Sequence, residues 1–150
     1  MKFVVDVMLG RLARWLRLLG FDVVYRPDAS DEQLIAIAEA EERTLLTKDA
    51  RLLRDCRVNG YLVKSARWED QLREVLAEFH LRDLIRAFTR CPECNALLVA
   101  VEKEAVRSRL PQNVYEEQTD VHLCPRCSRL YWAGTHVERM SRKIEELLGE

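Results

Sequence analysis

Short apolar runs alternate with helical spacing along the first half of the chain. Runs rich in β-branched residues predict strands over residues 3–7, 21–25, 44–47 and 58–63. Apolar residues three and four positions apart predict helices over residues 9–19, 30–43 and 68–79, with the last pattern continuing over 81–88. A short helix through Leu52 and Leu53 is also predicted after Asp49. Strands that alternate with helices in this way favour an α/β fold, in which a parallel sheet is flanked by helices on both faces.

Local signals mark where two of these helices begin and end. Gly20 follows the first helical pattern and predicts its C-cap. Ser30 and Gln33 have the spacing of a capping box, so the second helix should begin there. The first helix also carries Arg11, Arg14 and Arg17 opposite its leucines, and such a row is most simply a solvated face, with contact to nucleic acid as the alternative.

The second half of the chain contains two Cys-x-x-Cys pairs, which are Cys91 with Cys94 and Cys124 with Cys127. Two such pairs supply the four thiolates of a tetrahedral Zn²⁺. Apolar segments at residues 97–101 and 130–132 predict strands of a zinc ribbon, and residues 121–123 lead into the second cysteine pair. Residues 137–148 predict a terminal helix. We therefore divide the chain into an α/β domain over residues 1–89 and a zinc-ribbon domain over residues 90–150.

The composition of the chain bears on its possible partners and its compartment. The net charge is −1, so the overall electrostatic field does not indicate a polyanionic partner. No apolar run approaches the roughly 20 residues of a membrane span, and no signal peptide is evident, so we expect a cytoplasmic protein that has no membrane partner. In a reducing cytosol the cysteine pairs are expected to bind zinc rather than form disulfides, and Cys56 is left over. The sequence does not give the oligomeric state.

Three acidic residues follow or precede predicted strand–helix junctions. Asp6 closes the first strand, Asp31 opens the second helix and Asp49 follows the third strand. Ligands of parallel sheets collect at the carboxyl ends of the strands, and clustered carboxylates favour a hard divalent ion such as Mg²⁺. The alternative is local: Asp31 and Asp49 can simply stabilise helix N-termini. Asp6 is harder to explain in that way, because it directly ends a buried strand.

Several segments together resemble the Mut7-C RNase domain family. The motifs that carry the resemblance lie at residues 6–20, 43–49, 90–95 and 131–136, and the resemblance covers essentially the whole chain. It implies a PIN-like nuclease fold followed by a zinc ribbon. It also implies that Asp6 and Asp49 are acids of a catalytic site. Asp31 is the preferred third acid of that site, and Asp28 is the alternative. Asp55 and Asp70 are candidates for a fourth acid.

The leading hypothesis is a metal-dependent endoribonuclease that acts on RNA, preferably single-stranded. Asp6, Asp31 and Asp49 would hold catalytic Mg²⁺ or Mn²⁺, and the cysteines would hold structural Zn²⁺. Residues expected to bind RNA phosphates are Arg11, Arg14, Lys48 and Arg51. The alternative is a non-catalytic RNA- or ribosome-associated binding protein in which the ribbon recognises RNA. A weaker possibility is a protein-interaction partner that uses residues 68–88.

Overall fold

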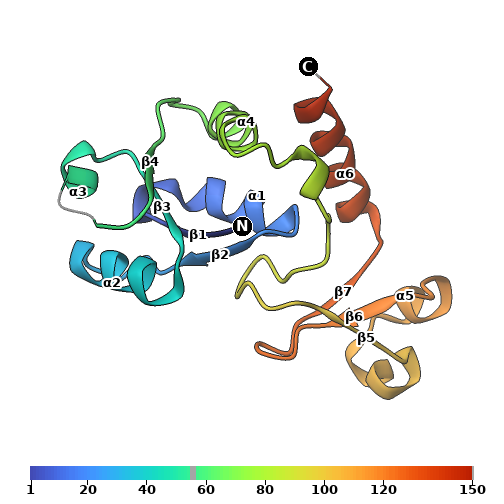
Figure 1. The fold of residues 1–150 in the computed structure, drawn as a ribbon. Coiled ribbons are helices and arrows are strands. Elements are labelled where there is room, and N and C mark those ends of the chain that lie inside the picture. Colours follow the sequence, from blue (N-terminus) through green and yellow to red (C-terminus); the bar gives the residue numbers. More distant parts are fainter. Residues whose placement is uncertain (55–56, 150) are drawn as a thin grey trace. The chain divides into compact units, whose positions relative to one another are not determined.

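The computed structural model describes residues 1–54 and 57–149, so Asp55 and Cys56 lie outside the described residues. The chain divides into two compact units, Met1–Asn95 and Ala96–Glu150, and each unit is described by itself. Figure 1 shows the first unit in blue to yellow and the second in yellow to red.

A four-stranded sheet forms the centre of the first unit (Figure 1). Its strands are β1 (Lys2–Val5), β2 (Asp22–Tyr25), β3 (Thr44–Thr47) and β4 (Gly60–Leu62). All neighbouring strands are parallel, in the order β2-β1-β3-β4. The helical elements are η1 (Val7–Leu9), α1 (Gly10–Leu18), α2 (Asp31–Glu41), α3 (Ala50–Arg54), α4 (Trp68–Glu78) and η2 (Arg82–Leu84). The predicted α/β architecture is therefore confirmed.

Alternate strand residues face two different helical layers. Val4 of β1 and Leu45 of β3 belong to a core cluster with Leu34 and Ala38 of α2 and Leu52 of α3. On the other face, α1 packs against α4. The ring of Phe3 meets Phe79, which follows α4, edge to face with centroids 5.4 Å apart. The period of two along each strand thus separates two apolar layers, one on each side of the sheet.

The predicted helix boundaries hold where a local signal sets them. Ser30 and Gln33 form both hydrogen bonds of the capping box at the start of α2. Gly20 has a φ of 97°, and a Cβ at this position would lie 2.3 Å from the carbonyl oxygen of Arg86. Only glycine avoids both the left-handed strain and the clash.

The helical pattern predicted over residues 81–88 is wrong. His80 has a φ of 53°, which turns the chain out of α4, and only the short η2 follows. Leu81 is buried while Leu84 is 54% exposed, so the apolar residues of this segment do not share one helical face. The amphipathic face of α4 itself is used inside the unit, since Leu72, Val75 and Leu76 are buried.

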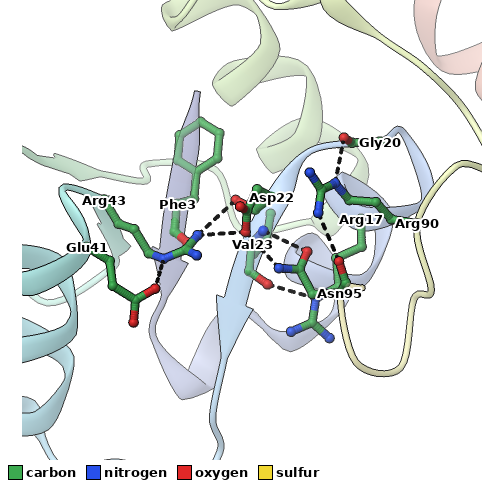
Figure 2. Close-up of polar contacts among 9 residues, drawn as sticks. All are labelled: Phe3, Arg17, Gly20, Asp22, Val23, Glu41, Arg43, Arg90 and Asn95. Atoms are coloured by element: carbon green, nitrogen blue, oxygen red, sulfur yellow. Dashed lines mark hydrogen bonds and ion pairs between the residues drawn. The ribbon is translucent and has the colours of Figure 1, made fainter. Parts of the chain in front are cut away.

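The prediction that Arg17 lies on a solvated helix face is wrong. Its side chain is only 7% exposed, and Figure 2 shows it directed toward the strand β2. Its Nε donates to the carbonyl oxygen of Val23 at 2.9 Å. Its Nη1 donates to the carbonyl oxygens of Pro92 at 3.1 Å and Glu93 at 3.3 Å. Arg17 therefore holds the first cysteine turn against α1 and β2 within the first unit.

A second polar group fixes the same turn (Figure 2). The amide of Asn95 donates to Asp22 at 2.7 Å and accepts from the backbone N–H of Val23 at 2.9 Å. Arg43 also pairs with Asp22 at 2.8 Å. Burial alone would raise the pKa of the Asp22 carboxyl, but the hydrogen bonds from Arg43 and Asn95 outweigh it and lower that pKa.

The second unit has a small antiparallel sheet. Its strands are β5 (Val99–Val101), β6 (Val121–Leu123) and β7 (Leu130–Trp132), in that order, and its helical elements are η3 (Lys103–Arg109), α5 (Gln112–Glu117) and α6 (Thr135–Leu148). Leu110, Val114 and Val121 form its buried cluster, with Trp132 packed against it. Among the described residues of both units, no helix combines the length and apolar character that a membrane span needs.

We expect Arg17→Ala to lower the free energy of unfolding by about 3 kcal/mol, because three carbonyl oxygens lose a buried charged donor. Arg14→Ala is the matched control on the same helix. Arg14 is half exposed and pairs with the Glu93 carboxylate, so its loss should cost no more than about 0.5 kcal/mol. Urea unfolding followed by circular dichroism measures both. Equal effects of the two substitutions would contradict the anchoring role of Arg17.

Candidate functional site

The strand order creates a switch point at the carboxyl edge of the sheet. β1 lies between β2 and β3, so the chain leaves β1 toward one side and later returns to its other side as β3. Open parallel sheets bind ligands at such a point, outside the carboxyl ends of the two strands. A ligand-binding site is therefore expected among the residues that follow β1 and β3.

Asp6 follows β1 at this point and is only 8% exposed. Its Oδ1 accepts a hydrogen bond from the N–H of Val7 at 2.7 Å, and its Oδ2 accepts from the hydroxyl of Thr47 at 2.8 Å. Its own N–H donates to the carbonyl oxygen of Leu46 at 3.0 Å. Both the backbone and the carboxylate of Asp6 are thus fixed by the ends of β1 and β3.

Asp49 is tied to Asp6 through one hydroxyl group. The side-chain oxygen of Thr47, which is fully buried, accepts from the N–H of Asp49 at 3.0 Å while donating to Asp6. The Asp49 carboxylate accepts from the N–H of Arg51 at 2.9 Å, as a helix cap would. Asp49 therefore caps α3, as the local interpretation predicts, and a metal-binding role for its partly exposed carboxylate stays a prediction.

The remaining acidic candidates among the described residues are exposed. Asp31 is the first residue of α2, and Asp28 lies in the turn before it. Asp70 lies on α4 and pairs with Arg73 at 3.2 Å. Asp55 is outside the described residues. The identity of a third and fourth acid therefore stays a prediction.

The four predicted phosphate-binding residues lie in different surroundings. Arg11 lies over the ring of Trp68, 5.7 Å from its centroid, and Arg14 pairs with Glu93. The Lys48 ammonium group donates to the carbonyl oxygen of Ser65 at 2.8 Å. Arg51 is largely exposed, 3.7 Å from the Asp49 carboxylate. Lys48 and Arg51 flank Asp49 in sequence, while Arg11 is on the helix that follows Asp6.

A pocket of about 480 Å³, to whose lining Arg11 contributes, was not predicted. Its lining comes from the segment after β1 and from the start of α4 and includes Met8, Leu9, Arg11, Arg67, Trp68 and Gln71. The sequence signal for it is weak: an apolar Val7-Met8 pair directly after Asp6, and a tryptophan at a helix start. Neither residue type shows by itself that the two segments meet.

Glu74 holds the loop that forms one wall of this pocket. Its two carboxylate oxygens accept four hydrogen bonds, from Tyr61 Oη at 2.6 Å, the N–H of Lys64 at 2.9 Å, and the N–H and hydroxyl of Ser65 at 2.9 and 2.7 Å. Desolvation alone would raise the pKa of Glu74, but these donors lower it to about 2. Desolvation and the same contact with Glu74 raise the pKa of Tyr61 to about 12.

The two Cys-x-x-Cys turns have the same backbone geometry. The residue after each pair, Asn95 or Ser128, has a positive φ and donates its N–H to the carbonyl oxygen of the first cysteine. The distances are 2.8 Å to Cys91 and 2.9 Å to Cys124. Each turn thereby directs its two sulfurs to the same side, as a metal knuckle requires.

The four cysteine sulfurs can hold a zinc ion. The Sγ atoms of Cys91, Cys94, Cys124 and Cys127 all lie within 4.8 Å of one another, and none of the four is in a disulfide. Tetrahedral Zn–S bonds of about 2.3 Å place sulfurs roughly 3.8 Å apart, so the observed group fits this ion. In the part of the chain that the structure describes, this is the one group of three or more potential metal-ligating side chains.

One family matches the chain. The family model described as the Mut7-C RNAse domain matches residues 1–144, nearly the whole chain. Neither the curated proteins nor the solved structures that were compared contain a match. The family description indicates an RNase-type function and an RNA substrate, and the cysteine group found above lies within the matched residues.

We expect Glu74→Gln to lower the free energy of unfolding by about 2–3 kcal/mol at pH 7. The pKa of Glu74 is lower in the folded protein, so its stabilisation is complete above pH 4.5 and is lost as the pH falls toward 2. The difference between wild type and variant should close over that range. Urea unfolding at a series of pH values measures it. Glu78→Gln, on the same helix and exposed, is the control, and a difference independent of pH would contradict this role.

Proposed function

The chain belongs to the Mut7-C RNAse domain family, and from this premise we propose that it is a metal-dependent endoribonuclease of single-stranded RNA. Asp6 and Asp49 would hold Mg²⁺ or Mn²⁺ at the carboxyl edge of the sheet, with Asp31 as the third acid. The observation that carries the proposal is the Asp6 carboxylate, buried at the switch point between β1 and β3.

The hydrogen bonds of Asp6 leave room for a cation. Each of its oxygens accepts one hydrogen bond from a neutral donor, Val7 N–H or the Thr47 hydroxyl. A carboxylate has about four acceptor positions, so unused lone pairs remain on both oxygens. Mg²⁺ is commonly bound by one or two carboxylates, several waters and substrate phosphates, rather than by a cage of protein ligands. Asp6 and Asp49 fit this kind of site without a third fixed carboxylate.

The neighbouring residues have distinct roles in the proposal. A bound divalent ion would supply a water of lowered pKa and stabilise charge on the phosphate. Thr47 orients the Asp6 carboxylate and the backbone of Asp49. Lys48 and Arg51 bring positive charge to the same edge and would bind phosphates of the RNA, as would Arg11 and Arg14.

The cysteine group has a structural role in the proposal. Four thiolates leave zinc no open position for water, so cleavage is assigned to residues 1–89 and the zinc-ribbon fold to residues 90–150. A cytoplasmic location follows from the same proposal, because a reducing compartment keeps the four thiols available for the metal.

We expect Asp6→Asn to reduce cleavage of a labelled single-stranded RNA about 100-fold or more, since it removes the buried charge that would hold the ion. The wild type should require added Mg²⁺ or Mn²⁺ after dialysis, which avoids a chelator that would strip zinc. Asp83→Asn, an exposed acid of η2, is the control and should cleave normally.

The outcome separates this proposal from its alternative. Equal cleavage by wild type and Asp6→Asn would sink the catalytic assignment. RNA binding that weakens with salt, with no cleavage by either protein, would favour a non-catalytic RNA- or ribosome-associated protein.

Zinc content tests the second metal site. The purified chain should contain one zinc per molecule, released on titration of the thiols and detected with a colorimetric chelator. Cys91→Ser should bind zinc much more weakly and lose thermal stability, because removing one of four ligands opens the site. Cys56→Ser should keep its zinc. Full zinc occupancy in Cys91→Ser would contradict the four-cysteine site.

A further inference from the structure

We propose that the pocket between the start of α1 and the start of α4 binds one nucleobase of the RNA substrate. This inference rests on the proposed ribonuclease function and names the part of the substrate that the site recognises. The pocket volume of about 480 Å³ lies within the range of roughly 300–1,000 Å³ typical of small-ligand sites, so a single base with its ribose can enter.

The position of the pocket connects it to the acidic site. Met8 and Leu9 belong to η1, the turn that directly follows Asp6, and the Leu9 N–H donates to the carbonyl oxygen of Asp6 at 2.9 Å. The opposite wall starts a few residues beyond the carboxyl end of β4. Both walls are therefore at the same edge of the sheet as Asp6. A base in the pocket would place its neighbouring phosphate near that edge.

Within a mainly polar lining, Met8 and Trp68 offer apolar contact of the kind that bases use. Met8 is 77% exposed, the most exposed large apolar side chain in the described residues. Trp68 is stacked on Trp15 with ring centroids 4.9 Å apart and an interplanar angle of 19°. This stack fixes the indole before any ligand binds. Thioether sulfur and indole carbon both make favourable contacts with aromatic rings, and such contacts tolerate any base.

Charged groups at the pocket favour a nucleotide over an apolar peptide. Arg11 lies over the Trp68 ring, and Arg67 pairs with Glu69 at 3.4 Å, which offsets the one acidic residue in the lining. The remaining charge is positive. A base flanked by phosphates combines an aromatic face with negative charge, and this matches the lining.

The wall formed by residues 66–69 is held in place without a ligand, through bonds to Ala66 and to Ser65 before it. The Gln71 amide donates to the carbonyl oxygens of Ser65 at 3.1 Å and Ala66 at 3.4 Å. The Glu74 carboxylate accepts a hydrogen bond from the N–H of Ser65, and the Lys48 ammonium group donates to the carbonyl oxygen of Ser65. Because this wall is already ordered, base binding would not have to supply the free energy to form it.

Binding of fluorescent single-stranded RNA to the zinc-loaded full chain tests the inference. Fluorescence anisotropy is measured in the Asp6→Asn background to prevent cleavage. Met8→Ala should raise Kd about 3- to 10-fold, the loss expected from one contact with a base. Met8→Leu should largely restore binding. Leu84→Ala, the truncation of a 54% exposed apolar side chain in η2 that does not line the pocket, should have no effect.

A set of RNAs with one abasic ribose at successive positions identifies the bound base. One abasic position should weaken binding by the chain that retains Met8, and Met8→Ala should add no further loss on that RNA. Equal loss from Met8→Ala on every RNA, or no loss on any, overturns the inference, as does failure to bind RNA at all.

The two proposals can fail separately. If cleavage depends on Asp6 but the Kd for RNA does not change in Met8→Ala, the base-pocket proposal fails and the ribonuclease proposal holds. If the base-dependent effect of Met8 appears without any cleavage, the pocket stands and the catalytic assignment fails.

Discussion

The parallel register between β1 and β3 places Asp6 beside Thr47, and the candidate site depends on that placement. Val5 pairs with Leu46, so the next residue of each strand meets at the carboxyl edge. The Thr47 hydroxyl has one proton, which it donates to Asp6, and it accepts the N–H of Asp49 with a lone pair. A one-residue slip would reverse the faces of Val4 and Leu45 and separate these groups. The apolar core that fixes the register therefore also builds the acidic site.

Carboxylates at the two edges of the sheet have different hydrogen-bond donors. At the amino edge, Asp22 is neutralised by Arg43, which also pairs with Glu41, and this group with Asn95 anchors a cysteine turn. At the carboxyl edge, the hydrogen bonds that Asp6 accepts come from neutral groups. A nearly buried carboxylate is stabilised best by a cation. The amino edge supplies that cation from the protein, whereas in our proposal a divalent ion from solution would supply it at the carboxyl edge.

Features determined by neighbours in sequence were predictable, and features determined by tertiary contacts were not. The capping box of Ser30, the C-terminal Gly20 and the cysteine spacing act within a few residues, so the sequence shows them directly. The position of Asp6 at the end of the first strand follows from the apolar run before it, whereas the strand order that makes this edge a switch point was not predicted. Arg17 was misread because its carbonyl partners include residues about 75 positions away. The pocket was missed for the same reason, since its walls follow β1 and β4.

A metal held by few carboxylates makes catalysis depend strongly on the substrate. If Asp6 and Asp49 supply the main protein ligands, RNA phosphates must complete the coordination, so ion and RNA bind with positive linkage. A base held between Met8 and Trp68 would add binding free energy away from the scissile bond. That energy can restrict the phosphate to the edge where Asp6 is fixed, which lowers the entropic part of the barrier. The rigid Trp15–Trp68 stack and the anchored wall suit this purpose better than a flexible surface would, because a mobile pocket would position the phosphate poorly.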